Sequence, residues 1–101
     1  KQAIESWESD KTVAIIASGG MSHFVIDEEF DRDFLDALKR KDKEKLISFP
    51  KEKFVSGTSE LLAWIAAAGA LEDLNMNLVN YIPTYRTTAM TGCGMGFVYW
   101  D

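Results

Sequence analysis

The fold is decided by the stretch from Val13 to His23, VAIIASGGMSH, which joins five consecutive apolar residues to the only histidine of the chain. The apolar run from Val13 to Ala17 is typical of a buried strand, and the break into Ser-Gly-Gly predicts a loop after it. Two adjacent glycines free the backbone for turns and remove side chains that would crowd the histidine. We therefore expect His23 near the C-terminal end of a buried strand, where open α/β sheets bind their ligands.

Length and composition limit the class of protein. The chain has 101 residues, of which 47% are hydrophobic and 27% charged, so we expect one small globular core. A net charge of -5 argues against nucleic acid as a partner, because phosphate binding requires a basic patch. The single cysteine, Cys93, rules out an intrachain disulfide and suits a reducing cytoplasm. With no signal-peptide pattern and no apolar run of membrane-spanning length, we expect a cytoplasmic protein without a membrane partner.

The first half of the chain carries helical patterns. Residues 1–9 should form the tail of a helix that packs on the sheet. A second helix should begin near Glu28 and run to Arg40, with an apolar stripe on one side. Residues 42–54 form either a short helix capped by Asp42 or a plain connector, and we favour the connector. Phe49 and Phe54 should anchor this segment to the core.

The second half predicts one helix and two strands. The helix should run from Glu60 to Ala68 and be buried on much of its circumference, because many of its side chains are small. Several hydroxyl residues before it could cap it. Strands are expected over 75–81, ended by Pro83, and over 93–99. Alternate glycines at positions 92, 94 and 96 should leave one face of the last strand bare for close packing.

Three sequence blocks resemble one enzyme family. The block SGGMSH (18–23) is similar to the signature of the class III extradiol ring-cleaving dioxygenases, which include the protocatechuate 4,5-dioxygenase β subunit. GTSELLAW (57–64), followed by AGAL (68–71), resembles the glutamate-bearing helix of that family, and YIPTY (81–85) fits its tail. The resemblance implies a mixed α/β fold and a single fragment, residues 1–101, that forms roughly the C-terminal third of a catalytic subunit. A start without methionine agrees with this interpretation.

His23 is the first candidate for catalysis. A lone histidine is often only a hydrogen-bonded structural residue, but such a residue does not need bare backbone before it. The resemblance implies that His23 is an acid/base beside an iron ion rather than a ligand of that ion. Histidine side chains titrate near neutral pH, so an imidazole can accept a proton from a catechol and return one later.

Glu60 is the candidate metal ligand. A glutamate in the first turn of a helix is also favoured by the helix dipole alone. On a helix buried on several sides, however, an unpaired carboxylate would be costly, and a metal would remove that cost. The resemblance implies that Glu60 is the carboxylate of a two-histidine, one-carboxylate Fe(II) site. This chain has one histidine, so it cannot complete the site, and the resemblance places both ligating histidines in an N-terminal region.

The loop after the strand expected over 75–81 is the candidate substrate site. Thr84 and Thr88 could bind a substrate carboxylate, and Arg86 could pair with it through two hydrogen bonds. The alternative is an ordinary polar loop. Two other features should carry no chemistry: the acidic residues between Asp27 and Asp33 are expected to form a solvated face, and Cys93 has no histidine near it in the sequence.

Taken together, the residues and the resemblance predict part of an enzyme that opens the ring of a catechol with O2. The expected substrates are of the protocatechuate or gallate type, and we expect a homo-oligomer, possibly with a small second subunit. The alternative from another class is an iron-free binding or scaffold module with the same fold. A small independent domain is a third possibility. Two histidines upstream of Lys1 would favour the enzyme, and their absence would favour the module.

Overall fold

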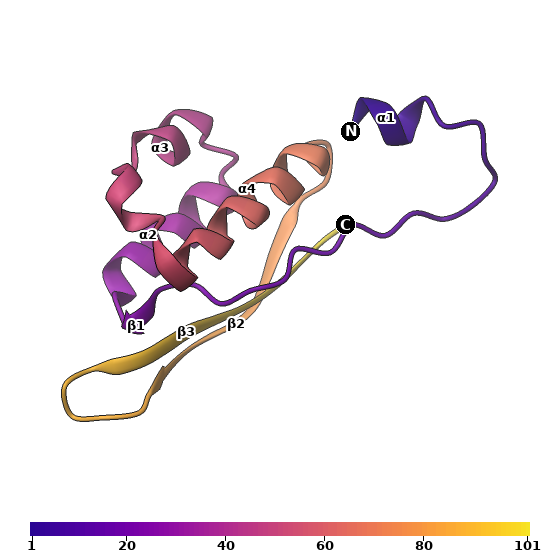
Figure 1. Ribbon diagram of the computed structural model, residues 1–101. Coiled ribbons are helices and arrows are strands. Elements are labelled where there is room, and N and C mark those ends of the chain that lie inside the picture. The colour runs from indigo at the N-terminus through magenta and orange to yellow at the C-terminus, as the bar shows by residue number, and fades with distance from the viewer.

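The computed structural model describes all 101 residues and places helices on a three-stranded antiparallel sheet (Figure 1). The predicted mixed α/β fold is confirmed. In chain order the elements are α1 (Gln2–Glu5), β1 (His23–Val25), α2 (Glu28–Lys39), α3 (Lys43–Ser48), the 3-10 helices η1 (Lys51–Lys53) and η2 (Ser56–Glu60), α4 (Leu61–Ala70), β2 (Met76–Tyr85) and β3 (Thr91–Trp100).

The sheet has the strand order β1-β3-β2, and β2 and β3 form a long hairpin. The predicted end of β2 at Pro83 is wrong, because the strand continues to Tyr85 and Pro83 pairs with Gly94. Since β2 is an edge strand, the missing N–H of proline is tolerated there. Val79 interrupts the register as a bulge. The short β1 pairs only with the start of β3, and it sets His23 directly opposite Cys93.

The helix α2 supplies much of the core. Asp27 caps it by accepting a hydrogen bond from the Phe30 N–H at 3.0 Å, and the helix ends close to the predicted residue. Its apolar stripe is buried as expected, and Phe34 has no exposed surface. Phe49 and Phe54 pack around Phe30 and Phe34 at ring-centroid distances of 5.2–6.3 Å, which confirms their anchoring role.

The favoured connector over residues 42–54 is wrong. A short helix, α3, forms there because the Asp42 side chain accepts a hydrogen bond from the Lys45 N–H at 2.9 Å. The hydroxyls before α4 do not cap that helix, contrary to the prediction. They lie in η2 instead, and the helix α4 extends past Gly69 to Ala70.

The glycines of β3 do allow close packing on one face. A side chain at Gly94 would collide with the Asp31 carboxylate, and one at Gly96 would collide with Met21 and Trp64. The predicted bare face is therefore confirmed. It lets the loop before β1 and the two helices α2 and α4 approach the sheet directly.

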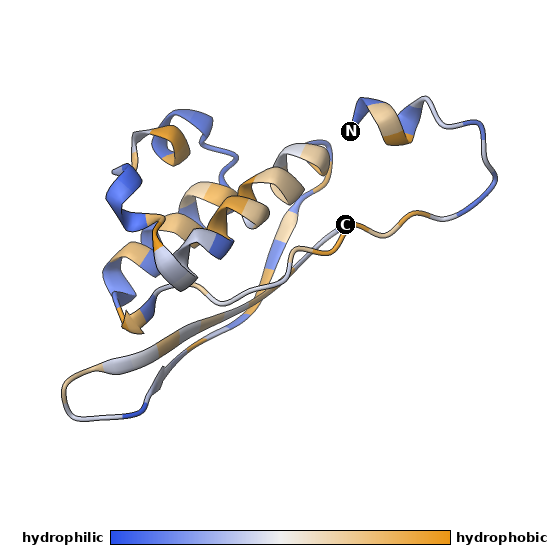
Figure 2. Cartoon of the chain, in the orientation of Figure 1, coloured by the Kyte–Doolittle hydropathy of each residue, from blue (hydrophilic) through white to orange (hydrophobic).

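The buried strand expected over residues 13–17 is wrong. This segment is extended but belongs to no strand, and none of its backbone groups forms a hydrogen bond with another backbone group. Ile16 is 86% exposed. Figure 2 shows the apolar colour of this stretch along the outside of the molecule. His23 therefore begins an antiparallel strand rather than following a buried parallel one.

Two helices are also less covered than predicted. The first, α1, buries no residue and lies apart from the sheet (Figure 1). The second, α4, buries only the face of Leu61, Trp64 and Ala67, and Leu62 is 52% exposed. The Cα radius of gyration is 14.7 Å, above the roughly 13 Å of a compact domain of this length. None of the helices is both long and apolar enough to cross a membrane.

Candidate active site

His23 is held in one orientation by its own loop. Its backbone N–H donates to the Thr58 hydroxyl at 3.0 Å, and its ring Nδ1 lies 2.7 Å from the Met21 carbonyl oxygen. A carbonyl oxygen only accepts hydrogen bonds, so Nδ1 carries a hydrogen. In the neutral ring, Nε2 is therefore the free base, and it points toward Glu60 and Cys93.

Glu60, the last residue of η2, places its carboxylate beside the His23 ring. Its Oε2 lies 3.5 Å from His23 Nε2 and accepts a hydrogen bond from the Gly20 N–H at 2.8 Å. The two side chains are 46% and 23% exposed, respectively. The pair can therefore accept a proton and hold it between two oriented atoms.

Glycines make this approach possible. A side chain at Gly19 would collide with Glu60, and side chains at Gly20 and Gly57 would collide with the His23 ring. Gly19 also has a φ of +125°, which other residues rarely adopt. The expectation that the Ser-Gly-Gly backbone clears space around the histidine is thus confirmed. Gly57, from the second sequence block, clears the other side of the ring.

The prediction of a solvated acidic face is wrong for Asp31. This residue has no exposed surface, and its carboxylate accepts hydrogen bonds from the Ser22 N–H, the Ser22 hydroxyl and the Tyr81 hydroxyl. Burial raises the pKa of the Asp31 carboxyl, while these three donors oppose the rise. Desolvation and the bond to Asp31 raise the pKa of Tyr81. The only available signal in the sequence was the place of Asp31 beside the apolar stripe of α2.

Cys93 and Phe24 were also missed. Cys93 Sγ lies 3.5 Å from His23 Nε2, because pairing of β1 with β3 joins residues distant in sequence. Burial raises the pKa of the Cys93 thiol, which makes the thiolate scarce and argues against a nucleophile. Phe24 has a φ of 67° and is 68% exposed beside His23. Backbone strain of this kind clusters at active sites and ligand clamps.

A pocket of about 310 Å³ connects His23 to two of the predicted substrate residues. Thr84 and Arg86 line it together with Phe24 and Cys93. Thr84 donates its hydroxyl hydrogen to the Cys93 carbonyl at 2.5 Å, and Arg86 takes part in none of the ion pairs of the chain. Thr88 does not line the pocket, because it lies in the turn at the tip of the hairpin.

The chain offers one good ligand for a metal and lacks a complete set. Glu60 fits because its carboxylate is oriented by Gly20 and remains partly exposed. No group of three or more His, Cys, Asp or Glu side chains is arranged to hold a metal ion. Because the chain has one histidine, a two-histidine, one-carboxylate site would need at least one ligand from residues outside this chain.

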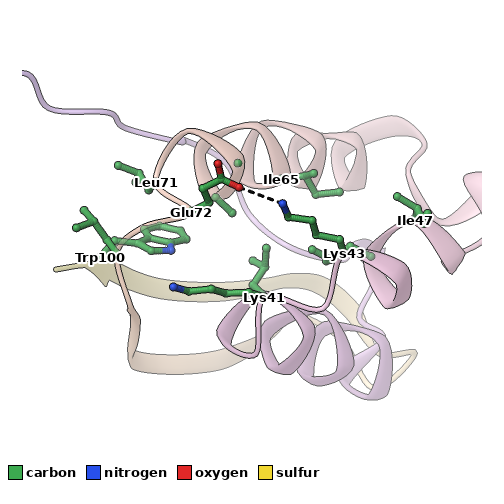
Figure 3. A pocket seen from close by; sticks show the side chains of 12 residues that line it. Lys41, Lys43, Ile47, Ile65, Leu71, Glu72 and Trp100 are labelled. Atoms are coloured by element: carbon green, nitrogen blue, oxygen red, sulfur yellow. Dashed lines mark hydrogen bonds and ion pairs between the residues drawn. The ribbon is translucent and has the colours of Figure 1, made fainter. Parts of the chain in front are cut away.

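A second cavity, of about 270 Å³, lies away from these residues between α3, α4 and the end of β3 (Figure 3). Its walls are mostly apolar and include Ile65 and Trp100. At its rim the Lys43 ammonium pairs with the Glu72 carboxylate at 3.0 Å. It contains none of the predicted site residues, so His23 and Glu60 remain the centre of the candidate site.

Comparison with known proteins identifies the family of this chain. Residues 1–96 match the model of a family described as the catalytic LigB subunit of aromatic ring-opening dioxygenase. The chain is 31% identical over 103 residues to a gallate dioxygenase of Pseudomonas putida, and the match covers 91% of this chain and 29% of that protein. No solved structure matches. The match to the family model covers nearly the whole chain, which therefore belongs to the family of catalytic subunits of aromatic ring-opening dioxygenases.

Proposed function

We propose that this chain is the C-terminal part of a dioxygenase catalytic subunit that opens the ring of a catechol with O2. The family and the gallate dioxygenase relative support the reaction class. The observation that carries the proposal is the convergence of His23 Nε2 and Glu60 Oε2 at 3.5 Å, although 37 residues separate them in the sequence. The substrate would be a catechol of the protocatechuate or gallate type.

His23 would act as the acid/base. Because the Met21 carbonyl keeps the hydrogen on Nδ1, Nε2 is the atom that takes a proton from a catechol hydroxyl. The neighbouring Glu60 carboxylate stabilises the resulting imidazolium. The ring can later return the proton to the departing oxygen. This role requires that the substrate hydroxyl enter beside Nε2, at the mouth of the pocket that His23 lines.

Glu60 would supply the carboxylate ligand for Fe(II). When bound, iron would supply the electron transfer that allows O2 to react with the electron-rich ring. The Gly20 N–H fixes one carboxylate oxygen of Glu60 and so orients the group before any metal arrives. The two histidine ligands would come from residues outside this chain, which spans 29% of the length of the gallate dioxygenase relative.

Arg86 would recognise the carboxylate of the substrate, and Thr84 would join it by turning its hydroxyl hydrogen from the Cys93 carbonyl toward that carboxylate. Both line the pocket of His23, and an exposed guanidinium without an ion-pair partner can bind a carboxylate through two hydrogen bonds. The role of Thr88 stays a prediction, since this residue lies outside the pocket. A cytoplasmic location and a homo-oligomer, with or without a small second subunit, complete the proposal.

Two substitutions in the intact catalytic subunit test the assignment. Glu60→Ala should abolish stoichiometric iron binding, because it removes a ligand. His23→Ala should keep iron and catechol binding but lower the rate of ring opening by about 100-fold or more, because general acid/base catalysis contributes that much. Glu29→Ala, an exposed carboxylate in the first turn of α2, is the matched control. Iron content, catechol affinity and oxygen uptake are the measurements.

Retention of full ring-opening activity by both site variants would contradict the assignment of the site. If the unmodified subunit binds neither iron nor a catechol, the iron-free binding module is the better description.

A further inference from the structure

Asp31 carries the only fully buried carboxylate of the chain. Asp31 has no exposed surface and forms none of the ion pairs of the chain. Burying an ionised carboxylate without a cation is costly unless hydrogen bonds compensate. Three donors compensate here, namely the Ser22 N–H at 2.9 Å and the Ser22 and Tyr81 hydroxyls at 2.7 Å. A buried network of this kind fixes the groups that take part in it.

Two of the three donors belong to the residue that precedes His23. Asp31 therefore holds both the backbone and the side chain of Ser22. The Ser22 hydroxyl in turn accepts the Asp27 N–H at 2.9 Å, so the start of α2 is joined to the same point. The backbone of Ser22 connects the Met21 carbonyl to the His23 ring that donates to it. A shift of Ser22 would move that carbonyl away from Nδ1.

The sheet keeps room for this carboxylate. Gly94 lies opposite Asp31, and a side chain there would collide with the carboxylate and approach the Tyr81 hydroxyl to 3.2 Å. The backbone of Gly94 also exchanges hydrogen bonds with the loop, because its N–H donates to the Ser22 carbonyl and its carbonyl accepts the Met21 N–H, each at 2.8 Å. Helix, loop and sheet thus meet at Ser22.

We infer that Asp31 is a positioning residue for His23: through Ser22 it holds the loop in the one conformation that keeps Nδ1 on the Met21 carbonyl and leaves Nε2 facing Glu60. Its effect on ring opening rests on the proposed function, whereas its effect on the tautomer of His23 does not. Asp31 touches neither substrate nor metal in this scheme. It acts only through the loop.

The tautomer of His23 tests this inference directly, because the chain has one histidine and therefore one pair of imidazole signals, from Nδ1 and Nε2, in its nitrogen NMR spectrum. At a pH where the ring is neutral, the unmodified chain should show the hydrogen on Nδ1. Asp31→Leu and Gly94→Ala should both give a mixture of tautomers, since the first removes the acceptor and the second displaces it. Asp31→Asn should preserve the Nδ1 form, because an amide oxygen can still accept the Ser22 N–H.

Two substitutions serve as matched controls. Asp33→Asn changes an exposed acid on the same helix, and Gly69→Ala adds a side chain that contacts nothing. Both should leave the tautomer unchanged. Dispersed amide spectra report whether each variant is folded.

Activity provides the second measurement. In the intact catalytic subunit, Asp31→Leu should lower kcat by about 100-fold with KM changed by less than about threefold, as expected for a misplaced catalytic group. Asp31→Asn should retain kcat within about tenfold. Folded Asp31→Leu and Gly94→Ala variants with an unchanged tautomer would overturn the inference, even if they are less stable. Absence of ring opening in the unmodified subunit would instead overturn the proposed function, and the tautomer would still decide the role of Asp31.

Discussion

The two faces of the hairpin differ in how they are covered. On the face toward α2 and α4, Met21, Phe34 and Leu61 have no exposed surface. On the other face Val79 is 66% and Tyr99 52% exposed. A groove of about 580 Å³ runs along β3 beside residues 13–17, and its almost entirely apolar lining includes Phe97 and Tyr99 of this face as well as the buried Trp64 of α4. Only the first of these faces is packed under the helices of this chain.

The difference shows what an apolar pattern can predict. The apolar run from Val13 to Ala17 indicates that this segment is buried in the folded protein, but it does not indicate which residues bury it. Its backbone groups also lack partners within the sheet, as in an unpaired edge. Because the chain spans 29% of the gallate dioxygenase relative, we propose that the remainder of a catalytic subunit covers this face.

The largest expected effect contrasts one aromatic residue from each face. Phe34→Ala should lower the free energy of unfolding by about 3–5 kcal/mol, because it opens a cavity in the core. Phe97→Ala, at a residue 48% exposed on the open face, should cost less than about 1 kcal/mol. Urea unfolding followed by far-ultraviolet circular dichroism measures both. Equal losses of unfolding free energy in the two variants would show that the two faces are equally buried.

An intermediate effect concerns Ile16 of the groove. In this chain Ile16→Thr should change the free energy of unfolding by less than about 0.5 kcal/mol, since the side chain is 86% exposed. In the intact catalytic subunit the same change should cost about 1–3 kcal/mol, because a hydroxyl would then be buried. Ile47→Thr, at a residue 84% exposed on α3, is the control and should be small in both. A small effect of Ile16→Thr in the intact subunit would refute the proposed cover.

The smallest effect is the pH dependence of two acids with opposite surroundings. Burial raises the pKa of Asp31, so its contribution to stability is present at low pH and is lost as pH rises through that raised pKa. The bond from Lys53 lowers the pKa of Asp27, so its contribution is present at neutral pH and is lost as pH falls. Urea unfolding between about pH 3 and pH 7 gives the free energy of unfolding of each variant, which is subtracted from that of the unmodified chain. This difference should fall with rising pH for Asp31→Asn and increase with rising pH for Asp27→Asn. Slopes of the same sign would contradict the burial of Asp31.

Local patterns predicted the elements whose partners lie within this chain. The bounds of α2 follow from its cap and stripe, and the bare face of β3 follows from its alternating glycines. The expected strand over 13–17 failed because no strand of this chain pairs with it. The end of β2 at Pro83 failed because the rule against proline in strands is relaxed at an edge.

The candidate site was predicted in part. The sequence blocks and their resemblance to a family made His23 and Glu60 candidates, and folding places their side chains together. Strand pairing brings Cys93 to His23, and packing of α2 against the loop brings Asp31 to Ser22, so neither partner could be named from the sequence. Contacts of this kind depend on topology, which residue spacing alone does not determine.

The central claim is that His23 and Glu60 have different roles at one site. A crystal structure of the intact catalytic subunit with iron and a bound catechol, with the metal located by anomalous scattering, tests it most directly. We predict that the Glu60 carboxylate binds the metal and that His23 Nε2 lies within hydrogen-bond distance of a catechol oxygen without binding the metal. A metal bound to His23, or a Glu60 carboxylate remote from the metal, would contradict the account.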